Sequence, residues 1–276
     1  MAGWFVSRTR GVWGVNLLLA AASGWGKSYV CQATTESNLG EYDGVVLLDY
    51  KDEYRGLVKA GKAKHWIAGP VEAEQWSTDH FRQLIEQNGN VVLARHSHLS
   101  PEQWRAVCAK AISAGRRSSL SVLWVIDEAH FVAQQQAKLL DPIKGLATTG
   151  RGEGQSSIWV TQRLSELAET IIAQCTARKL GGFESDRDLS KIGGVVDYPQ
   201  DLHRSGGHRV PGLPDDLHAD DGGPVSVRKW TDGDIVTGSE WIYSDDSGTV
   251  RRMNSANVDM DSEHVGAPGK SIKMPE

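Results

Sequence analysis

The feature that most constrains the fold of this 276-residue chain is a glycine-rich turn that directly follows a short, mainly apolar run. The run covers residues 15–20, and the turn reads Ala-Ala-Ser-Gly-Trp-Gly-Lys-Ser at positions 21–28. A buried strand that leads through such a turn into a helix presents backbone N–H groups, and the positive end of the helix, to a phosphate group. The sequence therefore predicts a phosphate-binding loop at residues 21–28.

The polar and small residues of this loop have separate expected roles. Lys27 should neutralise phosphate charge and Ser28 should ligate Mg²⁺, while the glycines let the backbone approach the phosphates of ATP. Two positions depart from the usual pattern, because Ala21 stands where glycine is usual and Trp25 is bulky where small residues are common. The predicted ATP-binding residues of the loop are Ser23, Gly24, Trp25, Gly26, Lys27 and Ser28.

Further apolar runs alternate with stretches of helical spacing. The runs are continuous rather than alternating, as in strands that are buried on both faces of a parallel sheet. They cover residues 45–49, 91–94, 122–126 and 157–161. Helices are expected at residues 27–39, 101–114 and 137–148. Alternation of strand and helix predicts an α/β fold with a doubly wound, mainly parallel sheet.

The pattern weakens in the last third of the chain. Residues 197–224 are rich in Pro, Gly, Asp and His and are expected to form a long surface loop. Residues 240–253 contain two short apolar runs around Asp-Asp-Ser-Gly, which predicts a β-hairpin. The expected organisation is a single ATPase domain over residues 1–254, with its motifs within 12–195, followed by a flexible tail at 255–276.

Length, charge and cysteine content narrow the choice of function. A chain of this length holds one ATPase domain but not the two tandem domains of a DEAH helicase, which residues 127–130 would otherwise suggest.

The charge is unevenly distributed along the chain. Residues 201–276 carry 14 acidic and 8 basic side chains, so the net charge of −5 leaves a charge of +1 on residues 1–200, which suits a surface that faces a polyanion. Three widely spaced cysteines favour reduced thiols in the cytoplasm, and no apolar run is long enough to span a membrane.

A second motif follows the run at residues 122–126. That strand should deliver Asp127 beside the phosphate loop, where its carboxylate would hold Mg²⁺ through water. Glu128 is then placed to polarise the attacking water as a general base. His130, at the start of the next helix, is expected to be structural rather than catalytic.

Three further side chains are candidates. Gln162 follows the run at residues 157–161 and is expected to sense the γ-phosphate or to orient the water. Arg151 lies in a glycine-rich loop and is a candidate for contact with a neighbouring subunit's nucleotide, with a solvated surface arginine as the equal alternative. Arg178, after the next apolar run, is the second arginine candidate for nucleotide contact.

The ordered set of motifs resembles the HerA/FtsK superfamily of DNA-pumping ATPases. Residues 49–54 read Asp-Tyr-Lys-Asp-Glu-Tyr and match the D-x-x-x-E-Y element of that superfamily, which adds Glu53 to the candidate site. The resemblance covers roughly residues 12–195. It implies a RecA-like P-loop ATPase that uses ATP and Mg²⁺ and assembles as a ring, expected to be a hexamer. It also favours Arg151 as the arginine that acts on the neighbour and Gln162 as the sensor.

Within that superfamily the chain looks like the genome-packaging ATPases of tailless icosahedral viruses with an internal membrane, including archaeal ones. The resemblance implies sequence-independent translocation of double-stranded DNA into a preformed capsid, contact with capsid vertex or portal proteins, and a location in the host cytoplasm or on the virion. The alternatives are a HerA-like translocase for DNA transfer or repair, and an assembly ATPase of the filamentous-phage type. An ATP-binding module without turnover is disfavoured, because such a module needs neither Glu128 nor Gln162.

Overall fold

A computed structural model describes residues 14–265, and the expectations for residues 1–13 and 266–276 lie outside them. The described chain forms one ten-stranded sheet in which β8 pairs with β9 and the other strands follow the order β10-β9-β7-β1-β6-β5-β2-β4-β3. Strands β1 to β7 are parallel, whereas β8, β9 and β10 pair antiparallel. The strands are β1 (Asn16–Ala20), β2 (Gly44–Asp49), β3 (Lys64–Ala68), β4 (Val91–Arg95), β5 (Val122–Ile126), β6 (Gln155–Thr161), β7 (Ala177–Leu180), β8 (Lys229–Asp232), β9 (Ile235–Asp245) and β10 (Val250–Asn254).

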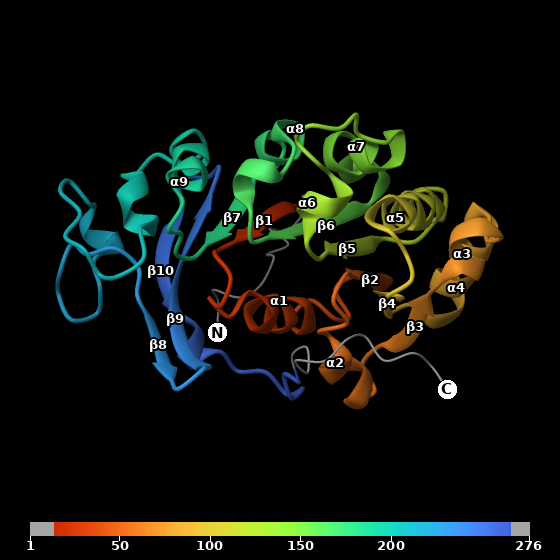
Figure 1. Ribbon diagram of the computed structural model, residues 1–276, viewed down its shortest axis with the longest axis horizontal. Helices are drawn as coiled ribbons and strands as arrows, with labels where there is room; N and C mark the ends of the chain where they lie inside the picture. The colour runs from red at the N-terminus through yellow and green to blue at the C-terminus, as the bar shows by residue number, and fades with distance from the viewer. Residues whose placement is uncertain (1–13, 266–276) are drawn as a thin grey trace.

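Helices cover both faces of the sheet, as a doubly wound fold requires (Figure 1). One face carries α1 and α2, and the other carries the helices from α3 to α8. The helices are α1 (Lys27–Glu36), α2 (Arg55–Lys59), α3 (Pro70–Glu74), α4 (Thr78–Asn88), α5 (Pro101–Arg116), α6 (Ala129–Val132), α7 (Asp141–Thr148), α8 (Glu169–Ala173) and α9 (Asp186–Gly193). None of the helices in residues 14–265 is both long and apolar enough to cross a membrane.

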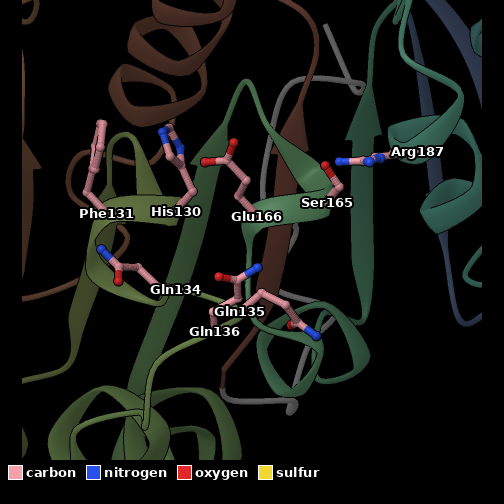
Figure 2. A pocket seen from close by; sticks show the side chains of 8 residues that line it. All are labelled: His130, Phe131, Gln134, Gln135, Gln136, Ser165, Glu166 and Arg187. Carbon is pink, nitrogen blue, oxygen red and sulfur yellow. The ribbon is translucent and has the colours of Figure 1, made fainter.

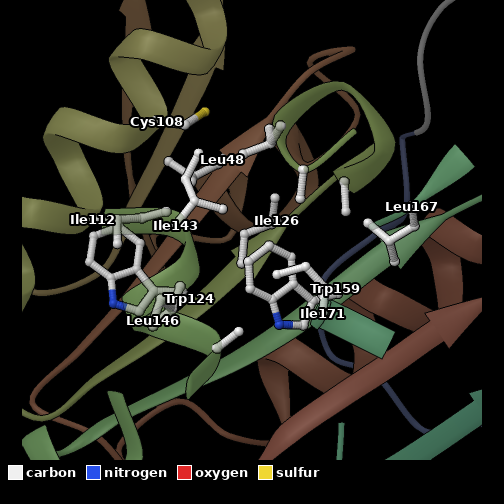
Figure 3. Packing of buried hydrophobic residues seen from close by; sticks show 14 of the residues in the cluster. Leu48, Cys108, Ile112, Trp124, Ile126, Ile143, Leu146, Trp159, Leu167 and Ile171 are labelled. Atoms are coloured by element: carbon white, nitrogen blue, oxygen red, sulfur yellow. The ribbon is translucent and has the colours of Figure 1, made fainter. Parts of the chain in front are cut away.

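The sheet separates two apolar cores because successive side chains of a strand point to opposite faces. In β1, Leu18 packs into the core beneath α5 and α7, whereas Leu17 and Leu19 pack into the core beneath α1. Figure 3 shows the first core, in which the indoles of Trp124 and Trp159 lie among leucine and isoleucine side chains. The continuous apolar runs of the sequence are therefore buried on both faces, as predicted.

The expected fold is confirmed, with differences at the ends of elements and in the weaker strands. Helix α1 ends at Glu36, three residues earlier than expected, and α7 begins at Asp141 rather than at residue 137. Helix α5 begins as predicted, because the Ser100 hydroxyl accepts a hydrogen bond from the Gln103 N–H and Pro101 occupies the first turn. Strands β3, β7 and β8 were not predicted, since they are short and carry charged residues.

The C-terminal third adds an antiparallel extension to the sheet beside β7. The predicted hairpin is present as β9 and β10, and β9 pairs with β7. Residues 197–224 differ from the expected surface loop, because several of their apolar side chains are buried against the core beneath α1. These side chains are Leu202, Val210, Leu213 and Leu217.

Residues 255–265 differ from the flexible tail that was expected. A single 3₁₀ turn, η5 (Ser255–Asn257), follows β10, and the chain then runs back along α1. Ser262 is buried there and donates a hydrogen bond to Glu36 of α1. The segment is held by polar contacts, which need no periodic apolar pattern in the sequence, so the sequence did not predict this docking.

Candidate functional site

The phosphate-binding loop has the backbone that its glycines predict. Gly24 and Gly26 have φ of 69° and 80°, a region that L-residues with a Cβ rarely adopt. Gly26 is also the N-cap of α1, so Lys27 and Ser28 begin the helix and their N–H groups face the turn. The Lys27 Nζ lies 3.2 Å from the Ala22 carbonyl oxygen. This arrangement gives a phosphate several N–H donors, a helix N-terminus and one ammonium group.

Trp25 is part of this loop, but its side chain points away from the phosphate position. The indole is 1% exposed, and its Nε1–H donates to the Glu240 carbonyl at 3.1 Å. A Cβ on Gly181 or Gly182 would lie 2.4 or 2.3 Å from the indole, so these glycines make room for it. The expectation that Trp25 binds ATP is corrected for the side chain, which anchors the loop to β9 and to the end of β7.

The carboxylates after β5 lie at the same edge of the sheet as the phosphate loop. Asp127 and Glu128 are both buried. One carboxylate oxygen of Asp127 is 3.4 Å from the Tyr54 hydroxyl, and the other, Oδ2, has no hydrogen-bond partner. Glu128 has a φ of 45°, in the left-handed region, and its Oε1 forms an ion pair with Lys51. A strained backbone and an unpaired buried acceptor are typical of functional sites.

His130 links this motif to the end of β6. Its Nδ1 lies 3.1 Å from the Thr161 hydroxyl and 3.4 Å from Glu128 Oε2. Burial lowers the pKa of His130, which favours the neutral imidazole. Gln162 directly follows Thr161, which pairs with Ala20, the last residue before the phosphate loop. The structure therefore brings the predicted sensor to the gap between the phosphate loop and Glu128.

The segment that follows β2 also contributes to the site. Asp49 is buried and accepts hydrogen bonds from the N–H groups of Lys51, Glu53 and Tyr54, so it shapes the segment rather than binding a ligand. Burial lowers the pKa of Lys27. Glu53 belongs to the segment that Asp49 shapes, and its contact with the nucleotide stays a prediction.

The two arginine candidates lie away from this site. Arg151 is in the turn η1 (Gly150–Glu153), four residues before β6, whereas the phosphate loop is at the opposite end of that strand. A seven-residue strand spans about 20 Å, so Arg151 does not reach the nucleotide of its own chain. Arg178 pairs with Asp246 at 3.0 Å and donates to the Cys175 carbonyl, which directs it to the same distant edge. Arg178, like Arg151, therefore does not reach the nucleotide site of its own chain, and its contact with a neighbour's nucleotide stays a prediction.

The residues present fit a magnesium ion that is held together with nucleotide phosphates. Within residues 14–265 no group of three or more His, Cys, Asp and Glu side chains makes a metal site by itself. Asp127 Oδ2 is, however, a buried oxygen without a partner, and the Ser28 hydroxyl begins the helix that follows the phosphate loop. Oxygen ligands that leave positions for water and phosphate are those that Mg²⁺ prefers. Ser28 and Asp127 would hold the ion.

Burial raises the pKa of Asp127 well above its ordinary value, and the charge of Glu128 raises it further. Burial also raises the pKa of Asp49 to about 7. A carboxyl group whose pKa is higher in the folded than in the unfolded state stabilises the fold at low pH, and this contribution is lost as the pH rises from about 4 through the folded-state pKa. In protein free of metal and nucleotide, Asp127→Asn should therefore become more stable than the wild type as pH rises from 5 to 8.

Urea denaturation of both proteins at a series of pH values measures this difference. Both proteins contain the buried His203 and Lys179, whose pKa values burial lowers to about 4 and about 7, so the pH dependence that these two groups cause cancels in the comparison. A difference in unfolding free energy that stays constant between pH 5 and 8 would contradict the raised pKa of Asp127.

A polar hollow of about 440 Å³ lies next to His130 on the α6 side of the site. Figure 2 shows that its side chains come from the segment after β5, from the loop after β6 and from α9. They are His130, Phe131, Gln134, Gln135, Gln136, Ser165, Glu166 and Arg187. The hollow extends the site beyond Glu128 along the carboxyl edge of the sheet.

Comparison with known proteins extends the resemblance to the fold. No protein-family model matches the sequence, and no curated protein matches it. The genome packaging NTPase B204 from Sulfolobus turreted icosahedral virus 2, in complex with ATP-gammaS, aligns with a TM-score of 0.55 at 14% identity, covering 87% of this chain and 96% of that chain. The same protein with AMPPCP aligns with a TM-score of 0.53 at 14% identity and the same coverage. The expected likeness to archaeal viral packaging ATPases is thus confirmed for the fold.

Sequence reasoning assigned no role to four side chains that lie near the site. Lys51 pairs with Glu128, Tyr54 contacts Asp127, and the Nζ of Lys229 lies 3.4 Å from the Gly24 carbonyl. His264 lies 3.4 Å from Ser28. Only Lys51 and Tyr54 carried a signal, since they belong to the segment that contains Asp49 and Glu53. The other two come from regions without a recognisable motif.

Proposed function

We propose that this protein is an ATPase that translocates double-stranded DNA, and that it packages a viral genome into a preformed capsid. The observation that carries the proposal is the convergence of Lys27, Asp127, Glu128 and Gln162 at one edge of the sheet. These four groups serve phosphate binding, metal binding, water activation and phosphate sensing. The fold shared with a genome packaging NTPase supports the coupling to DNA.

In the proposed reaction the N–H groups of the loop and Lys27 hold the phosphates of ATP. Bound Mg²⁺ would neutralise phosphate charge during the transfer. Glu128 accepts a proton from the attacking water, and its ion pair with Lys51 fixes the position of the carboxylate. Gln162, at the end of β6, orients the same water. His130 lies between Glu128 and the end of β6, with its Nδ1 3.4 Å from Glu128 Oε2 and 3.1 Å from the Thr161 hydroxyl.

The proposed assembly is a ring, with six subunits as the expected number. Arg151 lies at the edge of the sheet opposite the phosphate loop, so only a neighbouring subunit can present it to a nucleotide. An arginine supplied in this way stabilises negative charge in the transition state and increases the rate by about 10³–10⁵-fold. DNA contacts would be electrostatic and independent of sequence, because a packaging motor handles the whole genome. Capsid vertex or portal proteins would be further partners, in the host cytoplasm or on the virion.

The proposal is tested by the rate of ATP hydrolysis with and without double-stranded DNA, measured alongside the oligomeric state by analytical ultracentrifugation. We expect DNA to stimulate hydrolysis by an oligomer, and we expect Lys27→Ala to abolish both ATP binding and hydrolysis. A monomer that hydrolyses ATP at its full rate without DNA would contradict the ring translocase.

The role of Arg151 is tested by mixing two inactive variants. Arg151→Ala retains an intact nucleotide site, and Asp127→Asn retains an intact arginine. Mixed rings should therefore contain some interfaces with both groups and recover part of the activity. Arg204→Ala is the matched control, because the Arg204 side chain is partly exposed and forms ion pairs with the exposed carboxylates of Asp186 and Asp201. No recovery at any mixing ratio would remove Arg151 from the proposed site.

A further inference from the structure

The segment that follows β10 is bound along α1 by a set of polar contacts. The N–H groups of Asp261 and Ser262 donate to the two carboxylate oxygens of Glu36, at 2.8 and 3.1 Å. Lys62 lies 3.1 Å from Glu36 and 3.0 Å from Asp261. The end of α1 therefore anchors the returning chain through one carboxylate.

The backbone of α2 is shaped to admit this segment. The carbonyl oxygen of Glu263 lies 1.9 Å from the place that a Cβ on Gly56 would occupy, so any larger residue at position 56 would displace the segment. The buried side chain of Gln32 in α1 donates from its Nε2 to the Ser262 hydroxyl at 2.8 Å and to the Glu263 carbonyl at 3.2 Å. The segment thus occupies a site that both helices build.

These contacts fix which nitrogen of His264 carries the proton. Since the Gln32 Nε2 is directed to Ser262 and Glu263, its Oε1 is the atom that faces His264 Nδ1, at 3.0 Å. An amide oxygen only accepts hydrogen bonds, so in the neutral imidazole Nδ1 is the donor and Nε2 keeps its lone pair. The Nε2 lies 3.4 Å from the Ser28 hydroxyl, and the ring of Tyr29 packs edge-on against the imidazole.

We propose that His264 is a positioning residue for the metal site, whose Nε2 accepts a hydrogen bond from the Ser28 hydroxyl so that the oxygen lone pairs of Ser28 face Mg²⁺. The inference rests on the proposed function, since Ser28 is the expected metal ligand. A hydroxyl that ligates a cation must direct its hydrogen elsewhere, and partners that orient a ligand in this way typically contribute a factor of about 10–100 to metal affinity. The C-terminal segment therefore completes the ATP site.

The test measures binding of a fluorescent ATP analogue as Mg²⁺ is titrated, and again in EDTA. We expect His264→Ala to raise the Mg²⁺ concentration for half-maximal binding by about tenfold and to leave binding in EDTA unchanged within about twofold. His264→Gln, which keeps a hydrogen-bond acceptor, should restore part of the loss. Glu263→Ala is the matched control, because its exposed side chain is next to His264 and only its backbone carbonyl makes the contacts described above.

A double-mutant cycle separates this role from a general effect on the fold. In the Ser28→Ala background, His264→Ala should change the Mg²⁺ requirement little, because the hydroxyl that it orients is gone. An unchanged Mg²⁺ requirement in His264→Ala would overturn the inference. A lower requirement would overturn it as well, since the segment would then block the site. If the wild type does not bind the ATP analogue with Mg²⁺ at all, the proposed ATPase itself fails.

Discussion

Glu128→Gln is expected to lower the rate of ATP hydrolysis by about 10²–10⁴-fold while ATP still binds. Glutamine keeps the size of the side chain but cannot accept a proton from water. The carboxylate lies next to Lys51 and shares the edge of the sheet with the phosphate loop. Single-turnover hydrolysis of radiolabelled ATP measures the chemical step, and a fluorescent analogue measures binding. The variant should therefore hold ATP for much longer than the wild type.

Two control substitutions show whether the loss of hydrolysis is specific to the Glu128 carboxylate. Glu169→Gln removes an exposed carboxylate that pairs with Lys191 and should leave the rate unchanged. Lys27→Ala should instead prevent binding, because it removes the ammonium group of the phosphate loop. A Glu128→Gln rate within about tenfold of the wild type would mean that Glu128 is not the general base.

Trp25→Ala should destabilise the protein by about 3–5 kcal/mol and weaken ATP binding. The indole is almost fully buried, fills the space left by Gly181 and Gly182, and donates to the Glu240 carbonyl. Its loss leaves a cavity beneath the phosphate loop and removes the hydrogen bond of the indole to β9. Urea denaturation followed by circular dichroism measures the stability. Trp25→Phe should lose less stability. It loses the hydrogen bond to Glu240, but its apolar ring keeps part of the packing.

Two comparisons test the packing explanation. Trp230→Ala should have a much smaller effect, because the Trp230 side chain is 41% exposed. Gly182→Ala should destabilise the wild type, since the new methyl group would lie 2.3 Å from an indole carbon of Trp25. In Trp25→Ala the same glycine substitution should be better tolerated, because the clash is gone. Strictly additive effects would contradict the contact.

The sequence predicted those parts of the site whose residues lie within a local motif or directly after a buried strand. Residues 21–28 gave the phosphate loop, and buried strands placed Asp127 and Gln162 at their carboxyl ends. A parallel sheet brings all such ends to one edge, so side chains that are distant in sequence meet without any further information. Strand β6 lies between β1 and β5, which puts Gln162 between the loop and the carboxylates. The sequence did not predict this strand order, which only the structure showed.

The structure also explained why a tryptophan stands in the phosphate loop, which the sequence left open. The contacts of Trp25 join it to residues more than 150 positions later, and no local pattern reports such contacts. The position of Arg178 depends on similar contacts, because the pairing of β7 with β9 and the ion pair with Asp246 direct it to the far edge. The docking of His264 depends on single polar contacts to α1. The sequence determined the fold and the phosphate site through periodicity and glycine geometry, whereas contacts between distant residues were decided only by tertiary packing.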